Sequence, residues 1–154
     1  MKKVLIGLTL FVLLMVLGGL YHFLATEKEA NRLGTATRKL EIGSSIFEVE
    51  IADDSVEQSR GLSGRSSLPE NQGMLFVFSD QAIRSFWMRG MNFPLDIIWI
   101  SGDEIIGFSE NLPPANSIDY PLFSPPAPVD KVLEINAGLV KKFGIKIGDG
   151  IVLR

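Results

Sequence analysis

The chain has 154 residues, 46% of them hydrophobic, and a formal net charge of −3 at pH 7, which is enough for one folded domain with its own core. It contains no Cys and a single His, at position 22. Thiol nucleophiles, His-based triads and Cys/His zinc sites are therefore excluded from the part that follows residue 25. Any catalyst there would have to work with carboxylates, Arg, Lys, hydroxyls or a hard metal ion.

The apolar residues are concentrated near the N-terminus. Lys2 and Lys3 precede residues 4–25, a run that holds no Asp, Glu, Lys or Arg. A helix of this length spans about 33 Å, enough to cross a hydrocarbon core of about 30 Å. The run is longer than the apolar region of a cleavable signal peptide. The pattern predicts an uncleaved signal anchor over residues 1–25, with secretion after signal cleavage as the alternative.

The charges around this run predict its orientation. Lys2 and Lys3 favour a cytoplasmic N-terminus, so residues 26–38 are expected to be a tether and residues 39–154 an extracytoplasmic, periplasmic domain. Of the 15 Lys and Arg residues, 13 remain without these two lysines, against 18 Asp and Glu. A domain with the resulting net charge of −5 is not expected to bind nucleic acid.

About eight short strands are expected after the tether, from segments that are continuously apolar or alternate between apolar and polar residues. Gly43-Ser44 and Gly102-Asp103 are predicted hairpin turns, the second of type II′. Nine segments are candidates for these strands: residues 40–42, 46–51, 74–78, 86–88, 95–101, 104–109, 132–135, 145–147 and 151–153.

Capping signals predict two short helices. Asp54, followed three residues later by Glu, has the spacing of a capping box before a helix over about residues 55–62. Asn136 is expected to cap a second helix over residues 137–143, which Gly144 ends in the left-handed conformation.

The fold class follows from these elements. Residues 111–128 hold six of the eight prolines and are predicted to form an extended loop. With about eight strands and two short helices, the domain is expected to be mostly β, a sandwich or a barrel.

Four blocks of residues carry a resemblance to a known family. They are Arg60-Gly61-Leu62 with Arg65; Leu68-Pro69-Glu70 running into Gly73–Phe78; Phe86-Trp87-Met88 followed by Pro94–Ile98; and Val132–Gly138 with Gly148-Asp149. In their order and spacing, residues 38–154 resemble the family called domain of unknown function 192. The resemblance implies a compact, jelly-roll-like β domain, often exported in bacteria and archaea, with no established activity.

Five residues are candidates for ligand contacts. Arg60 and Arg65 flank a Gly-Leu-Ser-Gly turn, where guanidinium groups can bind a carboxylate or phosphate or can instead form salt bridges between helix and sheet. Asp96 and Glu134 lie in apolar runs, where a carboxylate needs a partner. The plainer alternatives are turn amides or an Arg partner for Asp96, and a solvent-facing position for Glu134. Trp87 would be core, or would stack on a sugar ring or a flat apolar ligand.

These residues leave three hypotheses of function. The first is a non-catalytic binding module for a small molecule, a glycan or a protein. The second is an envelope assembly or stability factor that acts through loop 111–128. The third is a hydrolase, or a hard-metal site, built on Asp96 and Glu134 as a carboxylate pair. No catalytic residue, metal or cofactor is assigned, and the membrane is expected to be contacted through residues 4–25.

Overall fold

The structure, a computed structural model, describes residues 15, 19, 37–115 and 121–154. The anchor predicted over residues 1–25 and most of the tether predicted over residues 26–38 lie outside the described residues, so both stay predictions. No helix among the described residues has the length and apolar character needed to cross a membrane.

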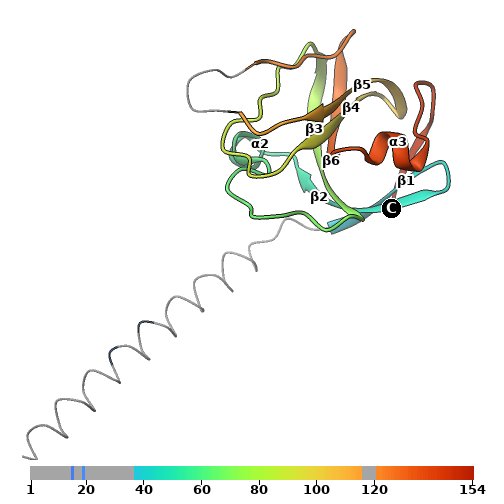
Figure 1. Cartoon of the computed structure of the whole chain (residues 1–154). Helices are drawn as coiled ribbons and strands as arrows, with labels where there is room; N and C mark the ends of the chain where they lie inside the picture. Colours follow the sequence, from blue (N-terminus) through green and yellow to red (C-terminus); the bar gives the residue numbers. More distant parts are fainter. Residues whose placement is uncertain (1–14, 16–18, 20–36, 116–120) are drawn as a thin grey trace, which may run out of the picture. The chain divides into compact units, whose positions relative to one another are not determined.

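Seven strands form one sheet (Figure 1). In the sheet they lie in the order β5-β4-β6-β3-β2-β1-β7, with β2 and β3 parallel and the other neighbours antiparallel. The prediction of a mostly β domain with two short helices is confirmed. The strands are β1 (Thr37–Ile42), β2 (Ser45–Ala52), β3 (Gln72–Ala82), β4 (Leu95–Ser101), β5 (Glu104–Leu112), β6 (Val129–Asn136) and β7 (Ile151–Leu153).

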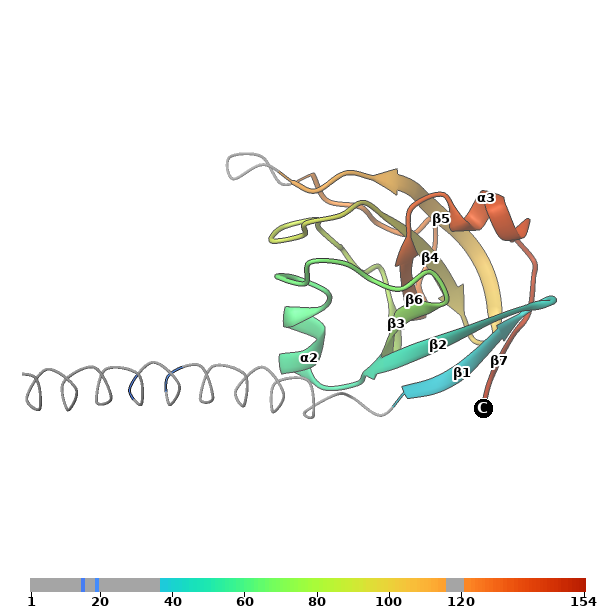
Figure 2. The ribbon, with the colours of Figure 1, turned by 60° about the horizontal axis from the view of Figure 1, so that its bottom comes forward.

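The sheet curls into a half-barrel (Figure 2), and its two edges meet at one end. Glu104, at the start of edge strand β5, forms an isolated bridge with Gly150. Next to it, the backbone N–H of Ile151 in edge strand β7 donates to the carbonyl of Asp103 over 2.8 Å. The expected sandwich or barrel is therefore, in the described residues, a single curled mixed sheet.

Both faces of the sheet are buried over residues 73–76 of β3, 95–100 of β4 and 132–135 of β6. Leu133 and Ile135 of β6 belong to a core cluster that also includes residues of β1, β2, β7 and α3 (Leu139–Phe143). Since strands from both ends of the sheet contribute to it, this cluster fills the concave face. Val132 belongs to a second cluster, which packs under Leu62 and Met88 from the loops over the convex face. A polar side chain in these stretches therefore has no solvent side to occupy.

Helix α2 (Ser55–Arg60) begins where the capping signal predicts. The Asp54 carboxylate accepts hydrogen bonds of 2.8 Å from the backbone N–H groups of both Val56 and Glu57, which satisfies two amides of the first turn. The Glu57 side chain reaches back to the N–H of Asp53 rather than to that of the cap residue. The cap fixes α2 against the end of β2.

Helix α3 ends as predicted but begins differently. Gly144 adopts the left-handed conformation with φ 64°, and its N–H bonds to carbonyls of the last turn. The predicted cap by Asn136 is wrong, because its side-chain amide donates to the carbonyl of Leu68 over 2.8 Å. The residue at the cap position is Gly138, which has no side chain to accept a hydrogen bond.

Asp96 supplies the missing cap from another part of the chain. Its fully buried carboxylate accepts hydrogen bonds from the N–H of Val140 in α3, over 3.0 Å, and from the N–H of Asn111 at the end of β5, over 2.8 Å. Asn111 has a positive φ of 54° and lies where the register of β5 against β4 shifts, between the pairs of Ser109 and Leu112. One carboxylate thus joins β4, β5 and α3.

Two segments predicted as strands are not strands. Phe86 forms only an isolated bridge, with Phe123, so residues 86–88 are a connecting segment over the convex face. Residues 145–147 follow the end of α3, where the N–H of Ile145 donates back to the carbonyl of Val140. Phe86, Met88 and Ile145 pack in or against the core clusters, whereas Trp87 and Ile147 are exposed, so the apolar pattern of these segments does not come from a strand.

We expect Asp96→Asn to destabilise the fold. The amide that replaces one carboxylate oxygen cannot accept, so one buried backbone N–H loses its partner, which costs about 1–3 kcal/mol. Urea unfolding followed by far-UV circular dichroism would measure the loss. The matched control is Asp53→Asn, at an exposed position, which should stay within about 0.5 kcal/mol of wild type. An unchanged stability of Asp96→Asn would contradict the assigned role.

Candidate functional site

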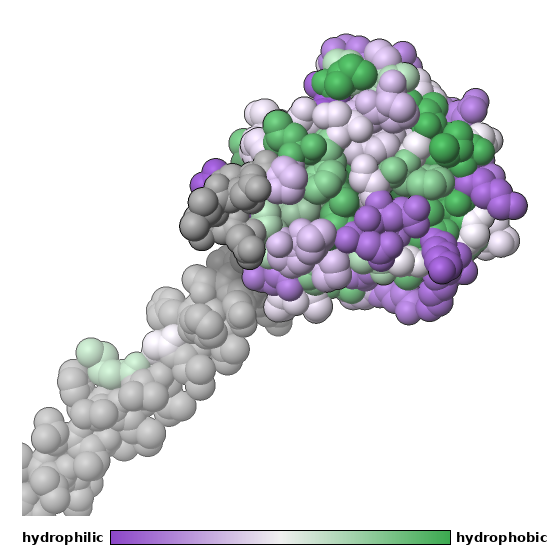
Figure 3. Space-filling view, turned by 45° about the horizontal axis from the view of Figure 1, so that its top comes forward, coloured by the Kyte–Doolittle hydropathy of each residue, from purple (hydrophilic) through white to green (hydrophobic). Residues whose placement is uncertain are grey.

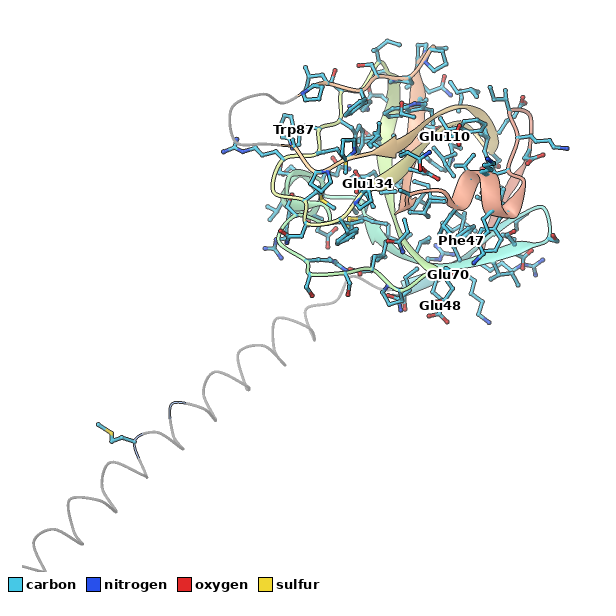
Figure 4. The ribbon with its side chains drawn as sticks, viewed as in Figure 1. Phe47, Glu48, Glu70, Trp87, Glu110 and Glu134 are labelled. Atoms are coloured by element: carbon cyan, nitrogen blue, oxygen red, sulfur yellow. The ribbon has the colours of Figure 1, made fainter. Side chains whose placement is uncertain are left out.

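A cavity of about 430 Å³ opens on the convex side of the sheet. Its wall comes from three separate parts of the chain: residues 55–63 of α2 and the following turn, residues within 76–91, and Glu134 of β6. Figure 4 shows Glu134 near the middle of the domain and Trp87 toward its edge. Segments far apart in sequence therefore share one cavity.

Glu134 is a buried carboxyl in this cavity. On β6 it lies between Met74 of β3 and Ile97 of β4 in the strand register, and its exposed fraction is 5%. Burial raises its pKa from 4.5 to about 8, so the carboxyl is largely protonated at pH 7. Among the described residues, no group forms a hydrogen bond or ion pair with its side chain.

The turn after α2 brings the backbone close to Glu134. Gly61 has φ 50°, and a Cβ built there would lie 3.4 Å from Cζ of Phe76 and 3.9 Å from Oε2 of Glu134. A residue with a side chain would be strained at this φ. Glycine therefore lets the chain pass over the carboxyl while the preceding residue, Arg60, stays exposed in the cavity wall.

Trp87 lies in the cavity wall and is half exposed. Its neighbour Phe86 instead packs edge-on against Phe76, with ring centroids 5.0 Å apart, and against Trp99, at 5.6 Å. Packing of Phe86 fixes the segment and leaves the indole of Trp87 free on the cavity side. Figure 3 shows one face of the domain, on which exposed hydrophobic side chains lie among hydrophilic ones.

Arg65 does not belong to the cavity. Both terminal nitrogens of its guanidinium bond to the Glu50 carboxylate on β2, Nη2 to Oε2 over 2.8 Å. Hydrogen bonding to Glu50 raises the pKa of Arg65 against the effect of burial. Of the two roles expected for Arg65, ligand binding or a salt bridge, the structure shows the salt bridge, which connects the turn after α2 to the sheet.

Asp96 and Glu134 do not form a pair. In the register of β4 and β6, Asp96 lies opposite Ile135, and Ile97 lies opposite Glu134. Since successive side chains on a strand point to opposite faces, the two carboxyls lie on opposite faces of the sheet. The predicted carboxylate pair, for hydrolysis or for a hard metal, is wrong. Among residues 37–115 and 121–154, no group of three or more acidic or His residues is placed to hold a metal ion.

One cavity residue, Arg84, was not expected from the sequence. Its guanidinium lies 3.9 Å above the ring of Phe78, and its Nη2 donates to the Asp80 carboxylate over 2.7 Å. Its Nε is buried without a hydrogen-bond partner in the described part of the chain. Asp80 lies on strand β3 and Arg84 just beyond it, so no local sequence pattern predicts their ion pair or the cavity.

The site can recognise a ligand by hydrogen bonds and by stacking. It brings together Arg60, Trp87 and Glu134 of the five predicted residues, adds Arg84, and excludes the other two. Hydroxyl groups of four serines and apolar side chains complete the lining; they include Ser55, Ser59, Ser63, Ser85, Leu62, Phe76, Ile83, Phe86 and Met91.

Comparison with known proteins finds one family and related structures. The family model described as "DUF192: Uncharacterized ACR, COG1430" matches residues 38–153. A crystal structure from Sinorhizobium meliloti 1021, described as "a putative transcription regulator", is 29% identical with a TM-score of 0.73, over 78% of this chain and 95% of the other. A protein of unknown function from Novosphingobium aromaticivorans DSM 12444 is 32% identical with a TM-score of 0.71, over 77% and 86%. No protein of curated function matches.

We expect Glu134→Gln to change the pH dependence of stability. The raised pKa means that the folded chain keeps a proton that the unfolded chain releases between about pH 4.5 and 8. The free energy of unfolding of the wild type should therefore fall as pH rises through this window, by up to about 1.4 kcal/mol per pH unit from this group.

Urea unfolding at pH 5, 6, 7 and 8 tests this expectation. The decline should be clearly smaller in Glu134→Gln, whose side chain stays neutral throughout. Glu110→Gln, at an exposed position on β5, is the matched control and should follow the wild type. Equal slopes for the wild type and Glu134→Gln would show that Glu134 is not protonated at neutral pH.

Proposed function

The chain belongs to the DUF192 family, and from this premise we propose that it is a non-catalytic binding protein that holds a small molecule in the cavity beside Glu134. The family name assigns no activity, so the proposal rests on the site. The observation that carries it is a carboxyl with 5% exposure that has no partner among the described residues and borders an open cavity. A buried polar group in this state costs free energy, which a hydrogen bond from a ligand would offset.

The dimensions and lining of the cavity support a small ligand. Its volume of about 430 Å³ lies in the range of about 300–1,000 Å³ that is typical of ligand sites. The lining combines aromatic and aliphatic walls with a few polar groups, as such sites do. Trp87 offers an exposed aromatic face and Glu134 a hydrogen-bonding group at depth.

The proposal includes a location outside the cytoplasm. Residues 4–25 would anchor the protein in the membrane, with Lys2 and Lys3 on the cytoplasmic side. Residues 26–38 would then tether a periplasmic domain, which would meet its ligand in the envelope.

A role in nucleic-acid binding, suggested by the description of the relative from Sinorhizobium meliloti, is not favoured. Beyond Lys2 and Lys3 the chain carries 13 Lys and Arg against 18 Asp and Glu. Binding to a polyanion depends mainly on Lys and Arg contacts to phosphates. Protein binding through loop 111–128 stays a prediction, since residues 116–120 lie outside the described residues.

Ligand binding can be tested with the full-length chain and a panel of sugars, nucleotides, lipids, amides and small organic acids. We expect at least one class to raise the melting temperature and to change the fluorescence of Trp87. Trp87→Ala should weaken binding of that ligand about tenfold or more, because it removes the stacking surface. Val152→Ala on β7, exposed and outside the cavity, is the control. A panel without any stabilising compound would count against the proposal.

The proposed location can be tested with a reporter fused after Arg154. Alkaline phosphatase folds only where its disulfides form, outside the cytoplasm, so this fusion should be active and should stay with membranes after a high-salt wash. Activity in the soluble periplasmic fraction would instead indicate a cleaved signal. An inactive fusion would contradict the proposed orientation.

A further inference from the structure

The free polar groups of the cavity are mainly hydrogen-bond donors. The Arg60 guanidinium forms no hydrogen bond or ion pair with the described residues. Arg84 uses Nη2 for the carbonyl and carboxylate of Asp80 and keeps Nη1, while its Nε is buried. The indole N–H of Trp87 has no acceptor in the described residues, whereas that of the buried Trp99 donates to Ser109. A ligand with strong acceptors would therefore complement the site.

The charge of the cavity also favours an anion. Two arginines, Arg60 and Arg84, and one carboxyl, Glu134, line it. Asp80, the partner of Arg84, pairs with Nη2 and is itself exposed. The strand neighbours of Glu134, Met74 on β3 and Ile97 on β4, carry no charge. Since burial keeps Glu134 largely protonated at pH 7, it leaves the charge of Arg60 uncancelled and offers an O–H donor of its own, whereas the charge of Arg84 is paired with Asp80.

The rest of the lining suits a flat apolar body. Phe76 and Phe86 stand edge to face, and Leu62 and Met91 belong to the same convex-face core cluster. These side chains form the inner wall, and the half-exposed indole of Trp87 stands at the surface. Aromatic rings pack well in such surroundings, either stacked or edge-on.

Building on the proposed binding function, we infer that the ligand is an organic carboxylate with a flat apolar body. The carboxylate accepts hydrogen bonds from the Arg60 guanidinium and from the protonated carboxyl of Glu134, and the apolar body lies between Trp87 and the inner wall. A charged acceptor gives stronger hydrogen bonds than a neutral one, so charge is the property by which the cavity would distinguish its ligand from neutral molecules of the same shape.

The test compares 2-naphthoate with its neutral isostere 2-naphthamide, using the full-length chain at pH 6.5. The readout is the indole N–H resonance of Trp87, with Trp99, buried and hydrogen-bonded, as the internal reference. We expect naphthoate to bind at least tenfold more tightly than naphthamide. Arg60→Gln should remove most of this difference, while Arg38→Gln on β1, exposed and outside the cavity, should leave it unchanged.

The protonation of Glu134 gives a second, independent readout. Naphthoate stays ionised from pH 6.5 to 9.5, so its affinity for the wild type should fall about tenfold per pH unit above pH 8, as Glu134 loses its proton. In Glu134→Gln, where the amide can still donate, the affinity should not change with pH over this range.

Two results would overturn the inference. Equal affinities for naphthoate and naphthamide would show that the cavity binds ligands without selecting for charge, and the proposed binding function would stand. If neither compound shifts the Trp87 resonance, the carboxylate class is wrong. The binding function itself fails only if the wider panel of compounds also leaves the protein unaffected.

Discussion

Strands β4 and β6 are buried on both faces, and this constraint determines what becomes of the two acidic side chains they carry. Asp96 and Glu134 occupy neighbouring positions in the register, one step apart, and so they point to opposite core clusters. On the concave side, backbone N–H groups of Asn111 and Val140 reach the Asp96 carboxylate, which can therefore be buried completely. On the convex side no backbone N–H of the described residues donates to the Glu134 carboxyl. Its carboxyl borders a cavity instead, and burial favours its neutral form.

The backbone is closely packed on two sides of Glu134. A Cβ at Gly73 on β3 would lie 2.8 Å from the carbonyl oxygen of Glu134, and one at Gly61 would lie 3.9 Å from its Oε2. The strand cannot shift toward β3, and the turn after α2 already covers it from outside. A polar group held in this way lowers stability unless something binds it, a state that proteins tolerate mainly at functional sites.

The sequence predicted the elements whose signals are local, and missed those that depend on distant residues. The cap at Asp54 and the helix end at Gly144 hold because their partners lie within four residues. The cap of α3 was misassigned to Asn136 because its real acceptor, Asp96, is 44 residues away from the amide it binds. For the site, alternation along β6 placed Glu134 on the face of Val132. The cavity forms where separate segments of the chain meet over this face. The periodicity of a single strand does not predict how distant segments pack against it.

Two combinations of Arg and Glu differ in this domain: Arg65 with Glu50, and Arg60 with Glu134. The difference supports a role in ligand binding for the cavity and a structural role for the salt bridge. Arg65 and Glu50 neutralise each other through two hydrogen bonds between the guanidinium and the carboxylate. Arg60 and Glu134 share a cavity, yet they form no ion pair. Burying an ion pair removes water from both charges, and their attraction must offset this free-energy cost. Because the Arg60 guanidinium is exposed, its attraction does not offset the cost of burying a charged Glu134 carboxylate. The carboxyl is instead neutral and the guanidinium stays hydrated, so both keep their hydrogen-bonding capacity for a molecule that enters between them.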